Sequence, residues 1–76
     1  MITVKLYGLL RIESGIKEKQ TEAATVKEVL EQLAACGIDR KELNGCLILI
    51  NGNSANKRSK LTDGDTVVLM SPVAGG

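Results

Sequence analysis

The sequence contains no histidine, and this absence removes a large class of catalytic and metal sites. Without an imidazole, the chain can form neither a Ser-His nor a Cys-His nucleophile pair, and no histidine can ligate a metal ion. The only aromatic residue is Tyr7, so the chain offers no platform on which the bases of a single-stranded nucleic acid could stack. The two cysteines, Cys36 and Cys46, are too few and too far apart for a zinc site. We therefore expect no catalytic site of its own, no bound cofactor and no metal site.

An excess of charge of either sign is also missing, because ten basic residues stand against nine acidic ones, for a formal net charge of +1. Nucleic-acid-binding domains usually present a concentrated basic face, so this balance indicates no nucleic-acid partner. The longest apolar run, CLILI, is too short to span a bilayer, and the opening MITVKLYG shows no signal peptide. Small secreted domains usually carry more cysteines, which form disulfides. We therefore expect one cytoplasmic domain with no membrane partner.

The first part of the chain shows the periodicity of two strands. Residues 2–7 alternate cleanly between apolar and polar side chains, which is typical of a half-buried strand. Residues 16–22 alternate more weakly and predict a polar partner strand at the edge of a sheet. Residues 9–15, LLRIESG, separate the two segments and are interpreted as a loop closed by Gly15.

The segment TVKEVLEQLAACG predicts one amphipathic helix. Thr25 and Glu28 have the spacing of a capping box, in which a side chain at the start of a helix binds a free backbone N–H group. Gly37 stands where a helix commonly ends in a left-handed conformation. Apolar residues follow at helical spacing and form one stripe: Val26, Val29, Leu30, Leu33 and Ala34.

The second half of the chain predicts further strands. Residues 38–45 are interpreted as a connection with room for a short helical turn, and residues 46–50 as an apolar strand. The pair Asn51-Gly52 is a common turn sequence, and a short edge strand is expected near Ala55. Residues 66–70, TVVLM, predict the last strand. The predicted fold class is α+β, a mixed sheet of four to five strands with one main helix packed on one face.

The faces of these elements predict an aliphatic core and an uncovered apolar surface. The predicted core consists of Ile2, Val4, Leu6, Val26, Val29, Leu30, Leu33, Ile48, Ile50, Leu61, Val67 and Leu69. If these strand residues face the helix, four aliphatic side chains face away from it: Leu47, Leu49, Val68 and Met70. Exposed apolar groups of this size usually mark a protein interface, so these four residues are expected to form a docking patch.

Three other candidate sites have simpler explanations. The basic stretch at residues 57–60 could attract an acidic partner, but charged residues at a loop tip are the default at a protein surface. The sequence DGD at residues 63–65 suggests a turn before a strand, because a calcium loop needs many more oxygen ligands. Cys36 and Cys46 are expected to pack in the interior, as free cysteines usually do.

The order of elements and the ending LTDGDTVVLMSPVAGG resemble the ubiquitin-like sulfur-carrier family (the MoaD/ThiS family), and most closely its MoaD-type members, the small subunits of molybdopterin synthase. The turn ING at residues 50–52 is similar to the VNG-like turn of that family. The family usually has aromatic residues and a second proline before VxGG, where this chain has Leu69, Met70 and Ser71. The resemblance implies a β-grasp domain at residues 1–70, followed by an extended, flexible tail at residues 71–76.

The resemblance also implies a chemical role for the tail. In the family, the C-terminal glycine, here Gly76, is adenylated and converted to a thiocarboxylate that donates sulfur. The tail threads into a narrow channel of the activating enzyme, and the corresponding residues are Pro72, Val73, Ala74 and Gly75. Glycine suits such a channel because it lacks Cβ and adopts most backbone angles, whereas Pro72 stiffens the tail near its origin. ATP and Mg²⁺ are then used by the activating partner and not by this chain.

The implied partners are a ubiquitin-activating-type adenylyltransferase (MoeB/ThiF-like) and a sulfur acceptor. The preferred acceptor is the large subunit of molybdopterin synthase (MoaE-like), which makes molybdenum cofactor. Sulfur delivery to thiamin thiazole, cysteine or tungsten cofactor is an alternative. A different class of function is a protein modifier that forms isopeptide bonds through Gly76. The simplest alternative is an interaction module whose terminal glycines are inert.

Overall fold

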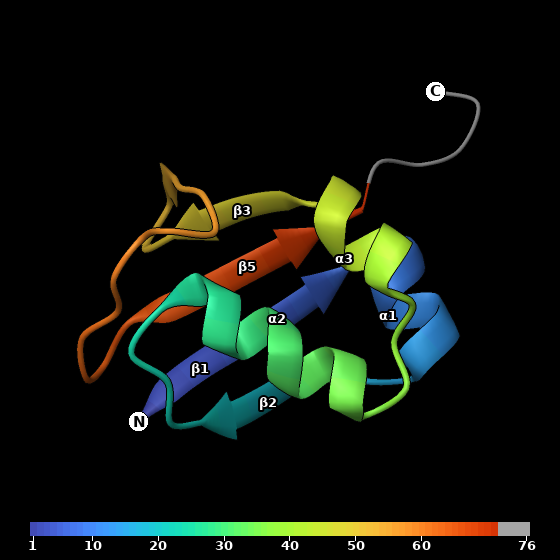
Figure 1. Ribbon diagram of the computed structural model, residues 1–76, viewed down its shortest axis with the longest axis horizontal. Helices are drawn as coiled ribbons and strands as arrows, with labels where there is room; N and C mark the ends of the chain where they lie inside the picture. Colours follow the sequence, from blue (N-terminus) through green and yellow to red (C-terminus); the bar gives the residue numbers. More distant parts are fainter. Residues whose placement is uncertain (72–76) are drawn as a thin grey trace.

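The computed structural model describes residues 1–71 and arranges them as one mixed sheet with helices packed against it (Figure 1). The elements in chain order are β1 (Ile2–Tyr7), α1 (Leu9–Ser14), β2 (Glu18–Thr21), α2 (Val26–Ala35), α3 (Arg40–Gly45), β3 (Leu47–Ile50), β4 (Asn53–Ser54) and β5 (Thr66–Met70). The strand order across the sheet is β2-β1-β5-β3-β4. The two central strands, β1 and β5, run parallel, and all other neighbours are antiparallel. The predicted mixed sheet with one main helix is confirmed.

The helix α2 forms where the sequence predicts it, because its start and end both carry the expected capping groups. Thr25 has an extended backbone, and its hydroxyl accepts a hydrogen bond from the amide of Glu28 at 3.3 Å. The carboxylate of Glu28 in turn accepts a hydrogen bond from the amide of Ala24 at 2.7 Å, one residue before the expected partner. At the other end, Gly37 has a φ of +102°, which a residue with a side chain rarely adopts. The predicted capping of this helix is confirmed at both ends.

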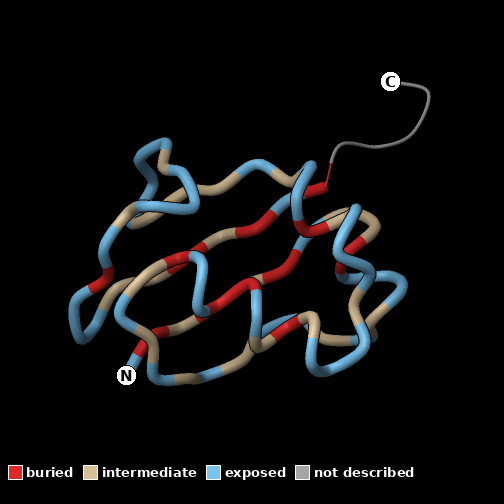
Figure 2. Tube along the Cα trace, in the orientation of Figure 1, coloured by how far each residue is buried: buried red, intermediate tan, exposed pale blue. Residues whose placement is uncertain are grey.

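The core is aliphatic and lies between α2 and the sheet (Figure 2). Its buried residues are Ile2, Val4, Leu6, Leu10, Val26, Val29, Leu30, Leu33, Leu43, Leu61, Val67 and Leu69. All the predicted core residues of β1, α2 and β5 are among them. Ile48 and Ile50 are only half-buried and pack against the rim of the core, because β3 lies toward the edge of the sheet beside the two-residue β4. Leu10 and Leu43 complete the core from the two short helices.

The interpretation of residues 9–15 as a loop is wrong, because residues 9–14 form the helix α1. A six-residue segment is too short to show helical periodicity, and Gly8 before it has no side chain with which to cap it. Gly15 does close the segment, in a left-handed conformation with a φ of 73°. The suggested helical turn in residues 38–45 is the helix α3, whose first turn is capped by the carboxylate of Asp39.

The polar strands differ only in length from their predicted ranges. The strand β2 is shorter than the predicted segment, and it pairs with β1 through four residues. The expected edge strand near Ala55 is the two-residue β4, just before that residue. The amide of Ala55 still donates to the carbonyl of Ile48 at 2.9 Å and ends the pairing with β3.

Candidate functional site

The four predicted patch residues lie together on the face of the sheet that α2 leaves uncovered. In the antiparallel pairing of β3 with β5, Leu47 is opposite Met70 and Leu49 is opposite Val68. Side chains of directly paired residues stand on the same face, a few ångströms apart. Leu47 is 59% exposed and Met70 is 39% exposed, which is high for large apolar residues. We call Leu47, Leu49, Val68 and Met70 the outer patch.

The strand register that underlies this patch is the predicted one. Ile48 is paired with Leu69, and Ile50 with Val67, in the alternate positions of the same two strands. Val67 and Leu69 are both 0% exposed, so their side chains fill the core beneath α2. Since successive strand residues point to opposite faces, the residues between them must face outward.

Tyr7 extends the patch and was not predicted to belong to it. It is the residue of β1 that pairs with Met70, and it is 39% exposed. The side chains of Tyr7, Met70 and Leu47 therefore form one row across the outer face. Aromatic side chains are enriched at the centres of protein interfaces, because they bury a large area at low conformational cost. Sequence alternation alone puts Tyr7 on the outer face, but only the parallel pairing of β1 with β5 brings it beside Met70.

A small hollow lies within the outer face, between β5 and the β3–β4 hairpin. It is lined by Leu49, Ser54, Ala55 and Val68 among others, and its volume is about 190 Å³. Pockets for small molecules or cofactors usually measure about 300–1,000 Å³. The hollow is therefore too small for a cofactor and suits a single side chain of a protein partner.

The opposite end of the outer face is polar and is held by a network around Asp65. The side-chain amide of Asn51 donates to the carboxylate of Asp65 at 2.9 Å. The side-chain oxygen of Asn51 accepts a hydrogen bond from the backbone amide of Thr66 at 3.0 Å. The backbone amide of Thr62 also donates to Asp65, at 2.8 Å. Hydrogen bonds from Thr62 and Asn51 hold the pKa of the Asp65 carboxyl below its usual range. The DGD segment is thus a turn, as predicted, and polar groups occupy the end of the outer face where β5 begins.

Ser71, the last described residue, is buried at that end of the sheet. It is 2% exposed, and its amide donates to the carbonyl of Tyr7 at 3.4 Å. Its hydroxyl oxygen accepts from the amide of Leu10 at 3.1 Å. This role was not predicted, because Ser71 has no local signal beyond its place before Pro72. The predicted tail residues Pro72, Val73, Ala74, Gly75 and Gly76 lie outside the described residues.

The two cysteines occupy different surroundings. Cys46 is half-buried, its thiol donates to the carbonyl of Leu43 at 3.0 Å, and burial raises its pKa. Cys36 is exposed at the end of α2, with the ammonium of Lys19 3.3 Å from its sulfur. The prediction of packing therefore holds for Cys46 and is wrong for Cys36, which follows the last residue of α2 and is exposed beside the edge strand β2.

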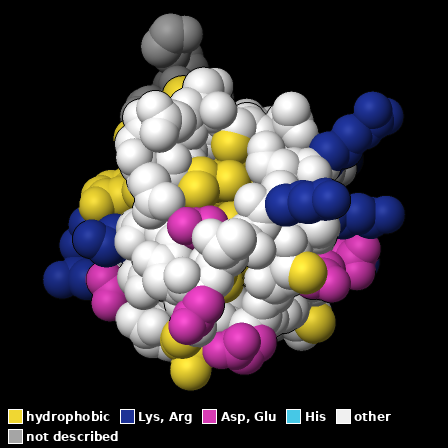
Figure 3. All heavy atoms as spheres, turned by 90° about the vertical axis from the view of Figure 1, so that its left-hand side faces the viewer, with side chains coloured by type: hydrophobic (Ala, Val, Ile, Leu, Met, Phe, Trp, Pro, Cys, Tyr) yellow, Lys and Arg dark blue, Asp and Glu magenta, His cyan; other side chains and the backbone are white. Residues whose placement is uncertain are grey.

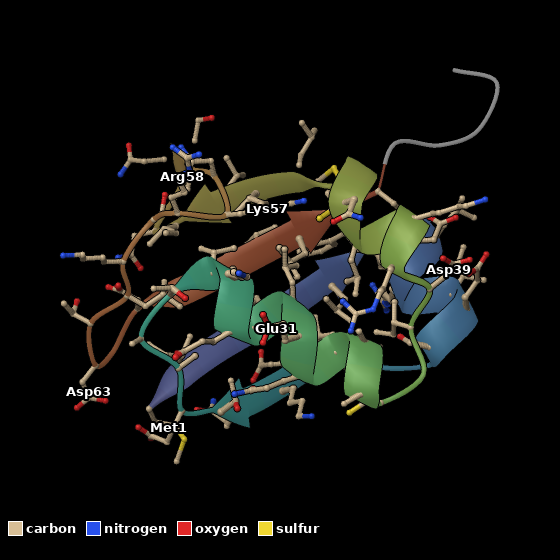
Figure 4. All side chains as sticks on the ribbon, viewed as in Figure 1. Met1, Glu31, Asp39, Lys57, Arg58 and Asp63 are labelled. Carbon is tan, nitrogen blue, oxygen red and sulfur yellow. The ribbon has the colours of Figure 1, made fainter. Side chains whose placement is uncertain are left out.

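Charged side chains of both signs are spread over the face that Figure 3 shows. Lys57 extends from the loop after β4 toward α3, where its ammonium donates to the side chain of Asn44 at 2.7 Å (Figure 4). Arg58 extends from the same loop and is exposed. On the face that Figure 3 shows, Lys and Arg side chains project at opposite margins, with Asp and Glu side chains between and below them. This face carries no continuous basic surface of the kind that nucleic acid requires.

Two other kinds of site are absent from the described part of the chain. Within residues 1–71, no helix has the length and apolar character needed to cross a bilayer. Over the same residues, the acidic and cysteine side chains form no group of three arranged to hold a metal ion.

Comparison with known proteins places the chain in a family. The sequence model of the ThiS family matches residues 4–76. A search of curated proteins finds no match. Among solved structures, the chain is similar to a chain of the complex of subunits 1 and 2 of the molybdopterin-converting factor from Helicobacter pylori, with 26% identity and a TM-score of 0.74 over 99% of this chain and 97% of that one.

Two archaeal structures are similar over nearly the whole chain. The small archaeal modifier protein 1 from Methanosarcina acetivorans shares 26% identity, with a TM-score of 0.82 over 99% of this chain and 95% of that one. A putative molybdopterin converting factor subunit 1 from Pyrococcus furiosus shares 25% identity, with a TM-score of 0.74 over 95% and 97% of the two chains. These structures confirm the β-grasp fold. The chain belongs to the ThiS family, among the ubiquitin-like sulfur carriers and modifiers.

Proposed function

We propose that this protein is a sulfur carrier whose Gly76 carboxylate is activated and converted to a thiocarboxylate, and that it serves as the small subunit of a molybdopterin synthase. One observation carries the proposal: the uncovered apolar row of Tyr7, Met70 and Leu47 lies at the end of the sheet where the chain passes from β5 into the tail. A partner that covers this row holds the start of the tail at its own surface. The family match, which extends to residue 76, supports the same conclusion.

The proposed chemistry explains why the tail needs an activating partner. A free carboxylate is a poor electrophile. One of its oxygens attacks the α-phosphate of ATP, which releases pyrophosphate and leaves an acyl adenylate on Gly76. A sulfide nucleophile supplied by a donor then attacks the same carbonyl carbon, and AMP leaves with the electron pair of the broken C–O bond. The product is a thiocarboxylate, a stronger nucleophile than the original carboxylate. All catalytic groups and the Mg²⁺–ATP belong to the partner, and this chain supplies a docking surface and a reactive end.

The outer patch suits both partners of such a cycle. The same tail must visit the activating enzyme and the acceptor, so one docking surface near the origin of the tail serves both. The Helicobacter pylori structure, a complex of subunits 1 and 2 of the molybdopterin-converting factor, supports an acceptor subunit as one of these partners. We propose that the patch binds an adenylyltransferase of the MoeB/ThiF type and then a MoaE-like large subunit.

The experiment that tests the carrier role is an intact-mass measurement. The purified protein is incubated with ATP, Mg²⁺, an activating enzyme of this type and a sulfide donor. Replacement of one oxygen by sulfur is expected, and the product should react with a thiol-alkylating reagent. A matched control carries one additional residue after Gly76, which moves the reacting carboxylate away from its position and should abolish the product. Failure of the unmodified chain to form this product would contradict the carrier role.

The acceptor is identified by supplying the thiocarboxylated protein to purified large subunit and molybdopterin precursor. Formation of molybdopterin is the expected outcome, and sulfur transfer only to a thiazole-forming, cysteine-forming or tungsten-cofactor system would replace this assignment. The similarity to a small archaeal modifier protein supports a second candidate function, the modification of target proteins. In that case, isopeptide conjugates larger than the free protein would appear on a denaturing gel of the host's extract.

A further inference from the structure

Ser71 is the buried polar side chain of the described residues, and the outer patch does not account for it. It lies one residue beyond β5, outside the strand ladder. Its amide reaches back to the carbonyl of Tyr7, and its hydroxyl accepts from the amide of Leu10, a residue 61 positions earlier in the chain. Both bonds tie the end of β5 to the junction between β1 and α1. A buried hydroxyl that satisfies a free helical N–H group is a specific structural interaction and is costly to lose.

The helix α1 depends on Ser71 because it has no cap of its own. A helix is usually capped by a side chain of the residue just before it. That residue here is Gly8, which has none, with a φ of 70° and a ψ of −142°. A Cβ atom built on Gly8 would lie 2.5 Å from the carbonyl oxygen of Ser71, a distance at which backbone must shift. Gly8 therefore leaves the space that Ser71 occupies, and Ser71 supplies the cap that Gly8 lacks.

From this arrangement we propose that Ser71 is a positioning residue: by capping α1 it fixes the point and direction from which the tail leaves the domain. This inference rests on the proposed adenylation of Gly76. Five residues follow Ser71, so the terminal carboxylate can lie at most about 17 Å from it. When the outer patch is docked, a fixed origin confines that carboxylate to a small volume at the partner's active site. Less conformational freedom is then lost when the tail enters the channel.

The test compares Ser71→Ala with Thr25→Ala, which also removes one helix-capping hydroxyl, at the start of α2 and far from the end of β5 (Figure 1). Adenylation is measured as pyrophosphate release with an activating enzyme of the ubiquitin-activating type. For Ser71→Ala we expect kcat to fall about fivefold, the change in rate that corresponds to losing one net hydrogen bond, while KM stays within about twofold. KM is preserved because the outer patch is unchanged. Thr25→Ala should leave kcat unaltered.

One further measurement separates the possible outcomes. Hydrogen exchange in the free protein should show the Leu10 amide exchanging about fivefold faster in Ser71→Ala, and not in Thr25→Ala. An unchanged kcat in Ser71→Ala, despite faster exchange at Leu10, would overturn the positioning role and leave Ser71 a purely structural cap.

A second variant covers the case in which Ser71→Ala does not fold. In this variant, two glycines are inserted between Ser71 and Pro72. Ser71 can still cap α1, but the flexible glycines mean that it no longer sets the direction in which the tail leaves the domain. The kcat of this variant should fall with no change in unfolding free energy, and an unchanged kcat would overturn the proposal. If the unmodified protein is never adenylated, the proposed function fails instead, and exchange at Leu10 still reports whether Ser71 caps α1.

Discussion

Replacing Leu69 by alanine and, separately, its neighbour Met70 by alanine tests the assignment of the two faces of β5. Leu69 is 0% exposed and pairs with Leu6 and Ile48 in the sheet. Truncating a leucine in such a packed site removes its burial energy and leaves a cavity, at a cost of about 3–5 kcal/mol. The whole domain has 76 residues, for which a total stability of about 4–11 kcal/mol is typical. Leu69→Ala therefore removes a large part of the stability and should leave a substantial unfolded fraction on mild warming.

Met70→Ala should give the reverse pattern. Met70 is 39% exposed on the outer face, so its truncation leaves no cavity and should change the unfolding free energy by less than about 1 kcal/mol. Its loss from the docked row should weaken binding to the activating enzyme at least about tenfold, as for the anchor residues of an interface.

Thermal unfolding and a binding titration measure the two effects on the same samples. We expect the melting temperature of Leu69→Ala to fall by more than about 10 °C, since about 1 kcal/mol corresponds to 4–8 °C in a domain of this size. If Met70→Ala destabilises the fold as much as Leu69→Ala, or leaves binding unchanged, the assignment of the faces and the docking role would be refuted.

Two further predictions concern backbone strain and pH. Gly8→Ala and Gly64→Ala both place a side chain at a positive φ, but only at Gly8 would the new Cβ collide with backbone, the carbonyl of Ser71. In a denaturant titration Gly8→Ala should therefore be the more destabilising by at least about 1 kcal/mol, and equal effects would contradict the described contact. Asp65 has a pKa below its usual range, so its hydrogen bonds stabilise the fold above the unfolded-state pKa of about 4, and this contribution is lost as the pH falls through the folded-state pKa. In Asp65→Asn the unfolding free energy should consequently fall less steeply between neutral and acidic pH than in the original protein. An equally steep fall would show that other carboxylates cause the loss of stability in acid.

The sequence predicts those elements whose signals are local. Alternation in residues 2–7 and helical spacing after Thr25 both describe faces that are really buried, because α2 covers the centre of the sheet. The outer patch was predictable for the same reason, since it follows from the alternation of two strands and the position of one helix. Ile48 and Ile50 show the limit of this reasoning, because hydrophobic pattern does not reveal how far a strand lies from the centre of the sheet.

The helix α1 could not be predicted because its decisive contact is non-local. Its cap is the hydroxyl of Ser71, which is 61 residues away from Leu10 in the chain. Residues 8–14 contain no capping residue at the position before the helix from which its start could be predicted. The same non-local contact is why the special position of Ser71 escapes sequence reasoning. Tyr7 is an intermediate case, since its outward orientation was predictable but its neighbour across the sheet was not.

The parallel pairing of β1 with β5 has a consequence for how the protein is made. The first and the last strand of the chain form the centre of the sheet, so the core cannot close until residues near 70 have left the ribosome. Before that point, the nascent chain has α2 and the β1–β2 pair, but it lacks β5, which joins β1 to β3 in the complete sheet. Pairing between distant parts of a chain is also slow to form, because a long loop must close first. A chain interrupted anywhere before the end of β5 would thus remain unfolded and open to proteases, so an incomplete chain would not display the docking surface.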